Sequence, residues 1–130
     1  AVREPEMLRC GIGYVGVYDL NSMYSTGDIP KSGGGAGYLE RVIGREKAAL
    51  DEFSPTTHAA RIKATPMLIH GEDDIRAPID HAYAMRDALE AVGKDPKWLK
   101  IDDSGHGAGS LKNRLELYEG LLGFLDSNLM

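Results

Sequence analysis

Two short loops of this sequence carry the residue types that a catalytic acid and base require. His106 stands between two glycines in DDSGHG, residues 102–107, so space for a substrate remains beside its imidazole. The earlier segment HGEDDIRAP, residues 70–78, holds several carboxylates. A buried carboxylate can accept the imidazole Nδ1–H and stabilise the imidazolium, which leaves Nε2 free to take a proton from a nucleophile. The pair of loops therefore predicts acid–base chemistry; the alternative is that His106 is a solvated loop residue.

The elements around these loops predict a parallel α/β architecture. Strand-like apolar runs lie at residues 10–18, 66–71 and 97–101, and the second is continuous enough for a strand covered on both faces. A helix is expected over 79–92, with its apolar face from Ala82, Met85, Leu89 and Val92 and a stop at Gly93. A last helix carries an apolar stripe, predicted as core: Leu111, Leu115, Tyr118, Leu122, Leu125 and Leu129. Alternating strands and helices favour right-handed parallel units, so both loops should open at one edge of the sheet.

The segment between the first two strands is less regular. YLERVIG and REKAALDEF predict short helices, and SGGGAG, residues 32–37, predicts a mobile surface loop near an active site. Gly11, Gly13 and Gly16 match a dinucleotide-binding pattern, but no helix is expected after them. We interpret these glycines as small residues that allow close strand packing. Cys10 lies in an apolar run and is expected in the core.

Composition and the remaining histidines exclude several other functions. The chain has 130 residues, 42% of them hydrophobic, and its net charge of -5 argues against a nucleic-acid partner. No apolar run approaches the roughly 20 residues that a membrane span needs. The four histidines have no metal-ligand spacing, so no metal and no cofactor are predicted. His70 is expected to order its loop through hydrogen bonds, and His81 to be exposed in the first turn of a helix. No signal-peptide pattern opens the chain, and a cytoplasmic location is expected.

A nucleophile does not accompany the acid and the base. The nucleophile elbow, G-x-S-x-G, occurs nowhere in the chain. Ser104 lacks the leading glycine and adjoins His106 too closely to be approached in line. In hydrolases with this elbow, the triad residues follow the order Ser, Asp, His along the chain. The serine is therefore expected upstream of Ala1.

These residues resemble the C-terminal part of the catalytic domain of the prolyl oligopeptidase family of serine peptidases, which includes acylaminoacyl-peptidases and dipeptidyl peptidases. The resemblance covers nearly the whole chain. It rests on REPEMLRCGIGYVGVYDL, on SPTTHAARIKATPMLIHGEDDIRAPIDHAYAMRDALEAVGK, and on DDSGHG with the helix that follows. The elements HG-x-x-D-x-x-x-P and GHG, in this order, are the most specific part. Ala77 stands where valine is more frequent in the family.

The resemblance implies a fold, a site and missing parts. The fold would be the C-terminal half of an α/β-hydrolase, a three-layer sandwich with mainly parallel strands, over residues 1–130. Asp74 would be the triad acid and His106 the base, whereas the elbow serine, the oxyanion hole and the family's β-propeller would be absent. The implied activity is hydrolysis of short peptides by the parent protein, with the fragment alone inactive. The alternatives are an α/β-hydrolase esterase and a non-catalytic association module. An unpaired central strand would pair with the missing half or with a second copy.

Overall fold

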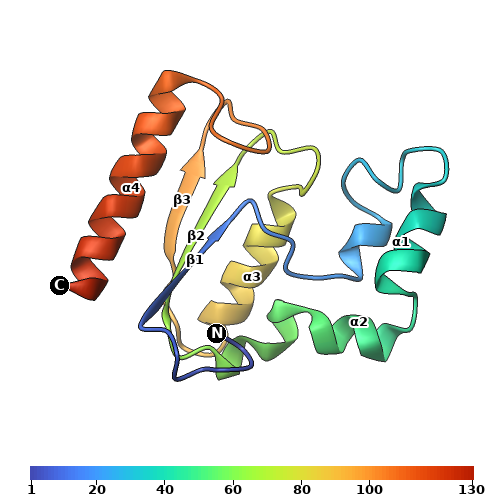
Figure 1. Cartoon of the computed structure of the whole chain (residues 1–130), viewed down its shortest axis with the longest axis horizontal. Coiled ribbons are helices and arrows are strands. Elements are labelled where there is room, and N and C mark those ends of the chain that lie inside the picture. Colours follow the sequence, from blue (N-terminus) through green and yellow to red (C-terminus); the bar gives the residue numbers. More distant parts are fainter.

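Three parallel strands form the centre of the molecule. The computed structural model describes residues 1–130, and its strands are β1 (Cys10–Tyr14), β2 (Thr65–Gly71) and β3 (Lys97–Ile101). The sheet has the order β1-β2-β3, and both strand pairs are parallel. Ile69 of β2 lies opposite Tyr14 on one side and Leu99 on the other. All three strands therefore end at the same edge of the sheet (Figure 1).

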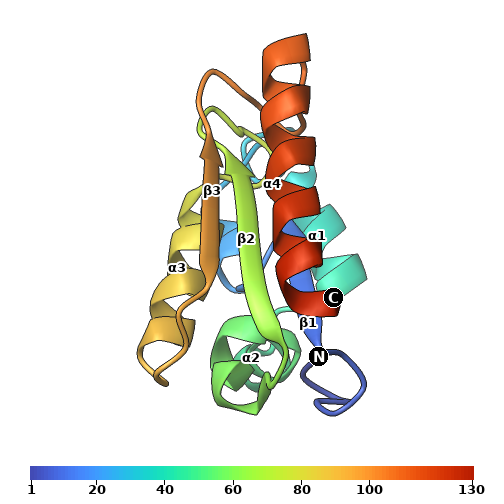
Figure 2. The same ribbon diagram turned by 90° about the vertical axis from the view of Figure 1, so that its left-hand side faces the viewer.

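Helices cover both faces of this sheet. The helical segments are η1 (Ser22–Tyr24), α1 (Gly35–Ile43), α2 (Lys47–Phe53), η2 (Pro55–Arg61), α3 (Asp80–Glu90) and α4 (Leu111–Leu129). α4 lies on one face and α3 on the other (Figure 2), which gives the predicted three-layer α/β arrangement. The two short helices expected between the first strands are confirmed as α1 and α2. None of the helices is long and apolar enough to cross a lipid bilayer.

Strand β2 joins the two halves of the core. Its Met67 and Ile69 pack with Leu117 and Phe124 of α4, and Cys10 lies partly buried beside this cluster. On the opposite face, Leu68 packs with the apolar residues of α3 and η2. Residues 67–71 are all buried, which confirms the prediction of a strand covered on both faces.

Helix α3 follows its predicted pattern except at its end. Ala82, Met85 and Leu89 are buried against the sheet, but the helix stops at Glu90 and Val92 is 43% exposed. Gly93 has a φ of 78° and its N–H still donates to the Glu90 carbonyl at 2.9 Å. A left-handed glycine ends a helix with little strain, so the predicted stop signal is confirmed.

The first strand is shorter than predicted. The expected strand over 10–18 ends at Tyr14, because Val15 adopts a φ of 46°. This left-handed conformation is strained for a β-branched residue and turns the chain out of the sheet. The Val15 N–H nevertheless donates to the Ile69 carbonyl at 3.0 Å. Apolar character continues beyond residue 14, so the sequence pattern could not reveal the turn.

The glycines of the first segment make room for a tyrosine. Tyr18 folds back against the strand and is buried, and burial raises the pKa of its phenol to about 12. A Cβ at Gly13 or Gly16 would collide with the Tyr18 ring. Close packing therefore accounts for these two glycines, as the sequence indicated, but not for Gly11, where a Cβ would meet nothing within 4 Å.

The apolar stripe of α4 contradicts the prediction that it is core. Its residues Leu111, Leu115, Tyr118 and Leu122 are between 54% and 67% exposed. The face that packs on the sheet carries Leu117, Leu121 and Phe124 instead. A 19-residue helix has more than one apolar stripe here, and only one can face a flat sheet. The second stripe is left uncovered in this chain.

The expectation that His81 is exposed is also wrong. His81 is buried in the first turn of α3, with 4% of its surface exposed. Burial lowers the pKa of its imidazole below the ordinary value of 6.5, against an opposing effect of the Asp19 carboxylate. The charged form is disfavoured because it would lose its hydration.

This burial predicts a pH dependence of stability. The unfolded chain binds a proton at His81 more readily than the folded chain, so the free energy of unfolding should fall as the pH drops below 6.5 and level off below the lowered pKa. We expect His81→Gln to remove this contribution, measured as the difference between urea unfolding at about pH 7 and about pH 5. The matched control His58→Gln, at a partly exposed histidine of η2, should keep the wild-type difference. Equal pH dependence in wild type and His81→Gln would refute the interpretation.

Candidate active site

The loops after β2 and β3 lie side by side at the carboxyl edge of the sheet (Figure 1). The Glu72 N–H donates to the Ile101 carbonyl at 3.0 Å, and the Asp73 N–H donates to the Ser104 carbonyl at 2.9 Å. Two backbone bonds therefore continue the β2–β3 pairing into the loops. This arrangement is the one expected from parallel strands, and it brings the acidic loop to the histidine loop.

Asp74 is held by its own loop. Its side chain is fully buried, and Oδ1 accepts the backbone N–H groups of Arg76 at 2.9 Å and Ala77 at 3.0 Å. This side-chain turn is a favoured conformation for aspartate. It fixes the plane of the carboxylate and leaves Oδ2 pointing to the histidine loop.

His106 completes the pair. Its Nδ1 lies 2.8 Å from Asp74 Oδ2, while 43% of its side chain remains exposed. Because the buried carboxylate accepts a hydrogen bond from the Nδ1–H, Nε2 is the nitrogen that is left to exchange a proton with a reacting group. The two residues predicted from sequence are thus brought together, with the carboxylate buried and the imidazole partly exposed.

The histidine loop is held in shape by its neighbours. Asp103 has a φ of 51°, and the Ser104 hydroxyl donates to the Gly107 carbonyl at 2.7 Å. The buried Asn113 side chain of α4 donates to the Asp102 and Asp103 carbonyls, at 3.3 Å each. Ser104 is itself buried, so its hydroxyl supports the loop and does not face the exposed side of His106. The sequence had already argued against Ser104 as nucleophile, because it lacks the leading glycine of the elbow and adjoins His106.

Gly71 sets how closely the two loops approach. A Cβ at this position would collide with the backbone carbonyls of Ser104 and Gly105. We expect Gly71→Ala to displace the histidine loop, to lower the unfolding free energy by about 1–3 kcal/mol and to reduce activity of the full-length protein. Gly109→Ala is the matched control, since nothing lies within 4 Å of a Cβ there. Thermal unfolding and turnover measure the two effects; equal behaviour of both variants would contradict this role.

A cleft of about 540 Å³ opens beside His106. The loop after β1 supplies its apolar wall, with Val17, Met23 and Ile29, and Ala77 of the acidic loop completes it. Arg76 and Asp28 stand at the polar side, with Nε and Oδ2 3.8 Å apart. Arg76 and Ala77 belong to the acidic loop that the sequence singled out, and Ser32, which also lines the cleft, opens the glycine-rich segment predicted near an active site. The other lining residues beside His106 were missed.

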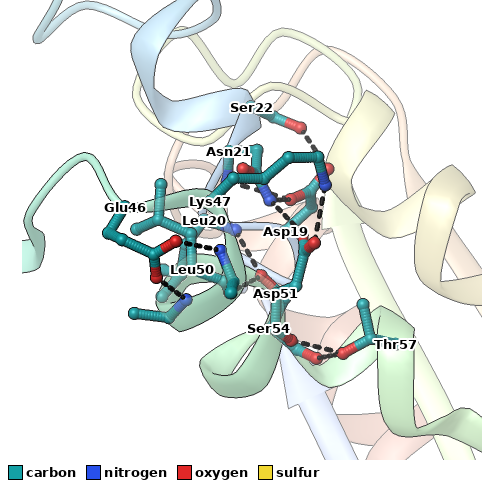
Figure 3. A network of polar contacts seen from close by, with 12 residues as sticks. Asp19, Leu20, Asn21, Ser22, Glu46, Lys47, Leu50, Asp51, Ser54 and Thr57 are labelled. Atoms are coloured by element: carbon teal, nitrogen blue, oxygen red, sulfur yellow. Dashed lines mark hydrogen bonds and ion pairs between the residues drawn. The ribbon is translucent and has the colours of Figure 1, made fainter.

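Polar contacts anchor the loop after β1, which forms the apolar wall of the cleft, to α2 (Figure 3). Asp19 Oδ1 accepts the Asn21 N–H at 2.9 Å, and the Asn21 amide donates to Asp51 at 2.8 Å. The Leu20 N–H donates to the buried Ser54 hydroxyl at 2.8 Å. The network satisfies backbone groups that the irregular loop would otherwise leave unpaired. The apolar wall of the cleft is therefore fixed to the body of the molecule.

The glycine-rich segment behaves differently from its prediction in one respect. Residues Gly35–Ile43 form α1, so the loop predicted over 32–37 ends three residues earlier than expected. Gly34 lies in the left-handed region with a φ of 85° and precedes the helix.

Nowhere in the chain do three His, Cys, Asp or Glu side chains gather closely enough to hold a metal ion.

Comparison with known proteins identifies the family. The sequence model of the prolyl oligopeptidase family of peptidases matches residues 1–130. The chain belongs to this family. Within the prolyl oligopeptidase family, a similar curated protein is the uncharacterized peptidase YuxL of Bacillus subtilis (strain 168), which is 27% identical over 94 residues. The aligned part is 70% of this chain and 14% of YuxL.

Solved structures of peptidases share the fold. Acylaminoacyl peptidase of Pyrococcus horikoshii superposes with a TM-score of 0.87 at 25% identity, over 99% of this chain and 21% of the peptidase chain. The puromycin-hydrolyzing peptidase of Mycobacterium tuberculosis gives a TM-score of 0.86 at 23% identity, over 99% of this chain and 20% of the other. The chain therefore has part of the α/β-hydrolase fold of the prolyl oligopeptidase family. The chain spans about a fifth of these solved chains, and less of YuxL.

Proposed function

We propose that this chain is the acid- and base-bearing part of a serine peptidase that hydrolyses short peptides. Asp74 and His106 are two members of its triad, and the serine comes from outside these 130 residues. One observation carries the proposal: His106 Nδ1 lies 2.8 Å from the buried Asp74 Oδ2, and the ring remains exposed beside a cleft. Family membership supports serine-peptidase chemistry for this pair.

In the proposed mechanism His106 takes up and releases a proton in each of the two halves of the reaction. Nε2 removes the proton of the serine hydroxyl as the oxygen attacks the peptide carbonyl, and the imidazolium then gives the proton to the leaving amine. Water repeats the sequence on the acyl-enzyme. Asp74 keeps Nδ1 protonated throughout and offsets the positive charge of the imidazolium. Its own position does not change, because two backbone N–H groups hold Oδ1.

The cleft beside His106 would receive a substrate side chain next to the scissile bond. Val17, Met23 and Ile29 favour an apolar side chain there. We expect Met23→Asp in the full-length protein to lower kcat/KM for peptides with an apolar residue at this position by about 10- to 100-fold. The control is Ser25→Asp, at an exposed residue near Met23 that does not line the cleft. Equal kcat/KM in the two variants would exclude this cleft as the binding site.

A fluorophosphonate probe tests the proposed function. The full-length protein should be labelled at its serine, and the isolated chain should not, because it has no nucleophile elbow. Paired peptide and ester substrates then separate a peptidase from an esterase. Labelling of the isolated chain would refute the proposal that the serine lies elsewhere. An unlabelled full-length protein would favour a non-catalytic association module.

The uncovered surfaces support a second part of the proposal, that another polypeptide segment packs on this chain. β1 pairs only with β2, so its outer edge is unpaired, and Ile12 and Tyr14 are each 36% exposed there. A groove of about 450 Å³ beside β1 is lined mainly by apolar residues, among them Leu8, Ile12 and Pro55. An unpaired edge beside apolar surface is a site of association. The remainder of the hydrolase domain or a second copy would cover it. A well-folded monomer of the isolated chain in size-exclusion chromatography at high concentration would count against this.

A further inference from the structure

A second histidine contacts the carboxylate that orients His106. His70 is the penultimate residue of β2 and is completely buried. Its Nε2 lies 2.6 Å from the Ala77 carbonyl oxygen and 3.3 Å from Asp74 Oδ2. The other ring nitrogen, Nδ1, has no hydrogen-bond partner although it is buried. The proposed mechanism gives this residue no role.

The contacts of His70 fix its tautomer. The Ala77 carbonyl oxygen can only accept, so Nε2 of His70 must carry the proton. The same nitrogen lies 3.3 Å from Asp74 Oδ2, close enough for its N–H to attract the carboxylate while it hydrogen-bonds to the Ala77 carbonyl. In the neutral ring Nδ1 then holds a lone pair without a donor, which is an unfavourable situation for a buried nitrogen. An apolar side chain would avoid that cost, and the Nε2–H is the only part of the imidazole that makes a polar contact.

The His70 N–H approaches the same oxygen that His106 uses. Asp74 Oδ1 has two backbone donors, whereas Oδ2 has His106 at 2.8 Å and His70 at 3.3 Å. No part of the Asp74 side chain is exposed to water that could replace a lost donor. We propose that His70 is a positioning residue whose Nε2–H holds Asp74 Oδ2 toward His106 and ties it to the acidic loop at Ala77.

Three substitutions in the full-length protein test this proposal, which rests on the proposed function for its kinetic readout. A glutamine amide can place an N–H near the position of Nε2, whereas an asparagine amide reaches only the position of Nδ1. We expect His70→Leu and His70→Asn to lower kcat by about 10- to 100-fold, as for other groups that orient a functional ligand. KM should stay unchanged because His70 does not line the cleft. His70→Gln should retain most of the activity.

The glutamine and asparagine variants decide the matter even if His70→Leu does not fold. Equal losses in both, or a wild-type kcat in His70→Leu, would overturn the proposal. NMR on histidine-labelled protein gives a readout that does not depend on catalysis, which is the downfield Nδ1–H resonance expected for His106. It should persist in His70→Gln and be lost in His70→Asn. If the wild-type protein neither cleaves peptides nor reacts with a fluorophosphonate, the proposed function fails, and this resonance still tests His70.

Discussion

Replacing His106 by alanine in the full-length protein should lower kcat by about 10⁵-fold or more, the loss found when the base of a serine triad is removed. Without the imidazole nothing takes the serine proton, and nothing protonates the leaving amine. Reaction with a fluorophosphonate should fall in parallel, because the probe needs the same activated serine. Steady-state kinetics and the labelling rate measure the two effects.

The loss should be catalytic and not a failure to fold. His106 is 43% exposed, and Asp74 keeps two backbone donors in its absence, so thermal unfolding should change little. His58→Ala is the matched control, since His58 lies in η2, which leads into the opposite end of β2. Its turnover should equal that of the wild type. Substantial residual turnover in His106→Ala would show that another group is the base.

Replacing Asp74 by asparagine should lower kcat by about 10⁴-fold, the effect of the wrong imidazole tautomer in a serine triad. The asparagine carbonyl must occupy the position of Oδ1, where the Arg76 and Ala77 N–H groups donate. Its amide NH₂ group then replaces Oδ2 and faces His106 Nδ1. Nδ1 can only accept from this group, so the proton moves to Nε2, where it prevents His106 from acting as a base. Steady-state kinetics of the full-length protein measure the effect.

The adjacent aspartate provides the control. Asp73 is exposed, and its contact with the histidine loop runs through its backbone N–H, which donates to the Ser104 carbonyl. Asp73→Asn leaves this bond in place and should keep nearly full activity. If Asp73→Asn proved as harmful as Asp74→Asn, the general negative charge of the loop would matter more than the orientation of His106. The prediction would then be wrong.

Much of the fold could be predicted because it depends on local patterns. Strands β2 and β3 are apolar runs, and helix α3 has apolar residues at helical spacing. Burial of side chains on a sheet is enough to require these patterns. Parallel strands bring the loops that follow them to one edge of the sheet, so the proximity of the loops around Asp74 and His106 could be expected before any coordinates. Which carboxylate would face the histidine followed from a resemblance and not from spacing.

The two wrong predictions about burial share a cause, which is that burial depends on what lies across space. The α4 stripe and the uncovered groove beside β1 are as apolar as core residues, yet this chain contains nothing that covers them. His81 looks like a surface residue in its helix, but Asp19 and the loop after β1 approach it from a distant part of the sequence. A one-dimensional pattern gives the amphipathic faces but not their partners.

The sequence by itself determined the acid–base loops, their order along the chain and the absence of an elbow serine within these residues. Only the tertiary structure decided that Asp74 Oδ2 meets His106 Nδ1, that His70 approaches the same oxygen, and that Val17, Met23 and Ile29 form an apolar cleft beside His106. The physical reason is that hydrogen bonds and clefts require positions accurate to a fraction of an ångström. Such accuracy comes from the packing of residues that are far apart in the chain.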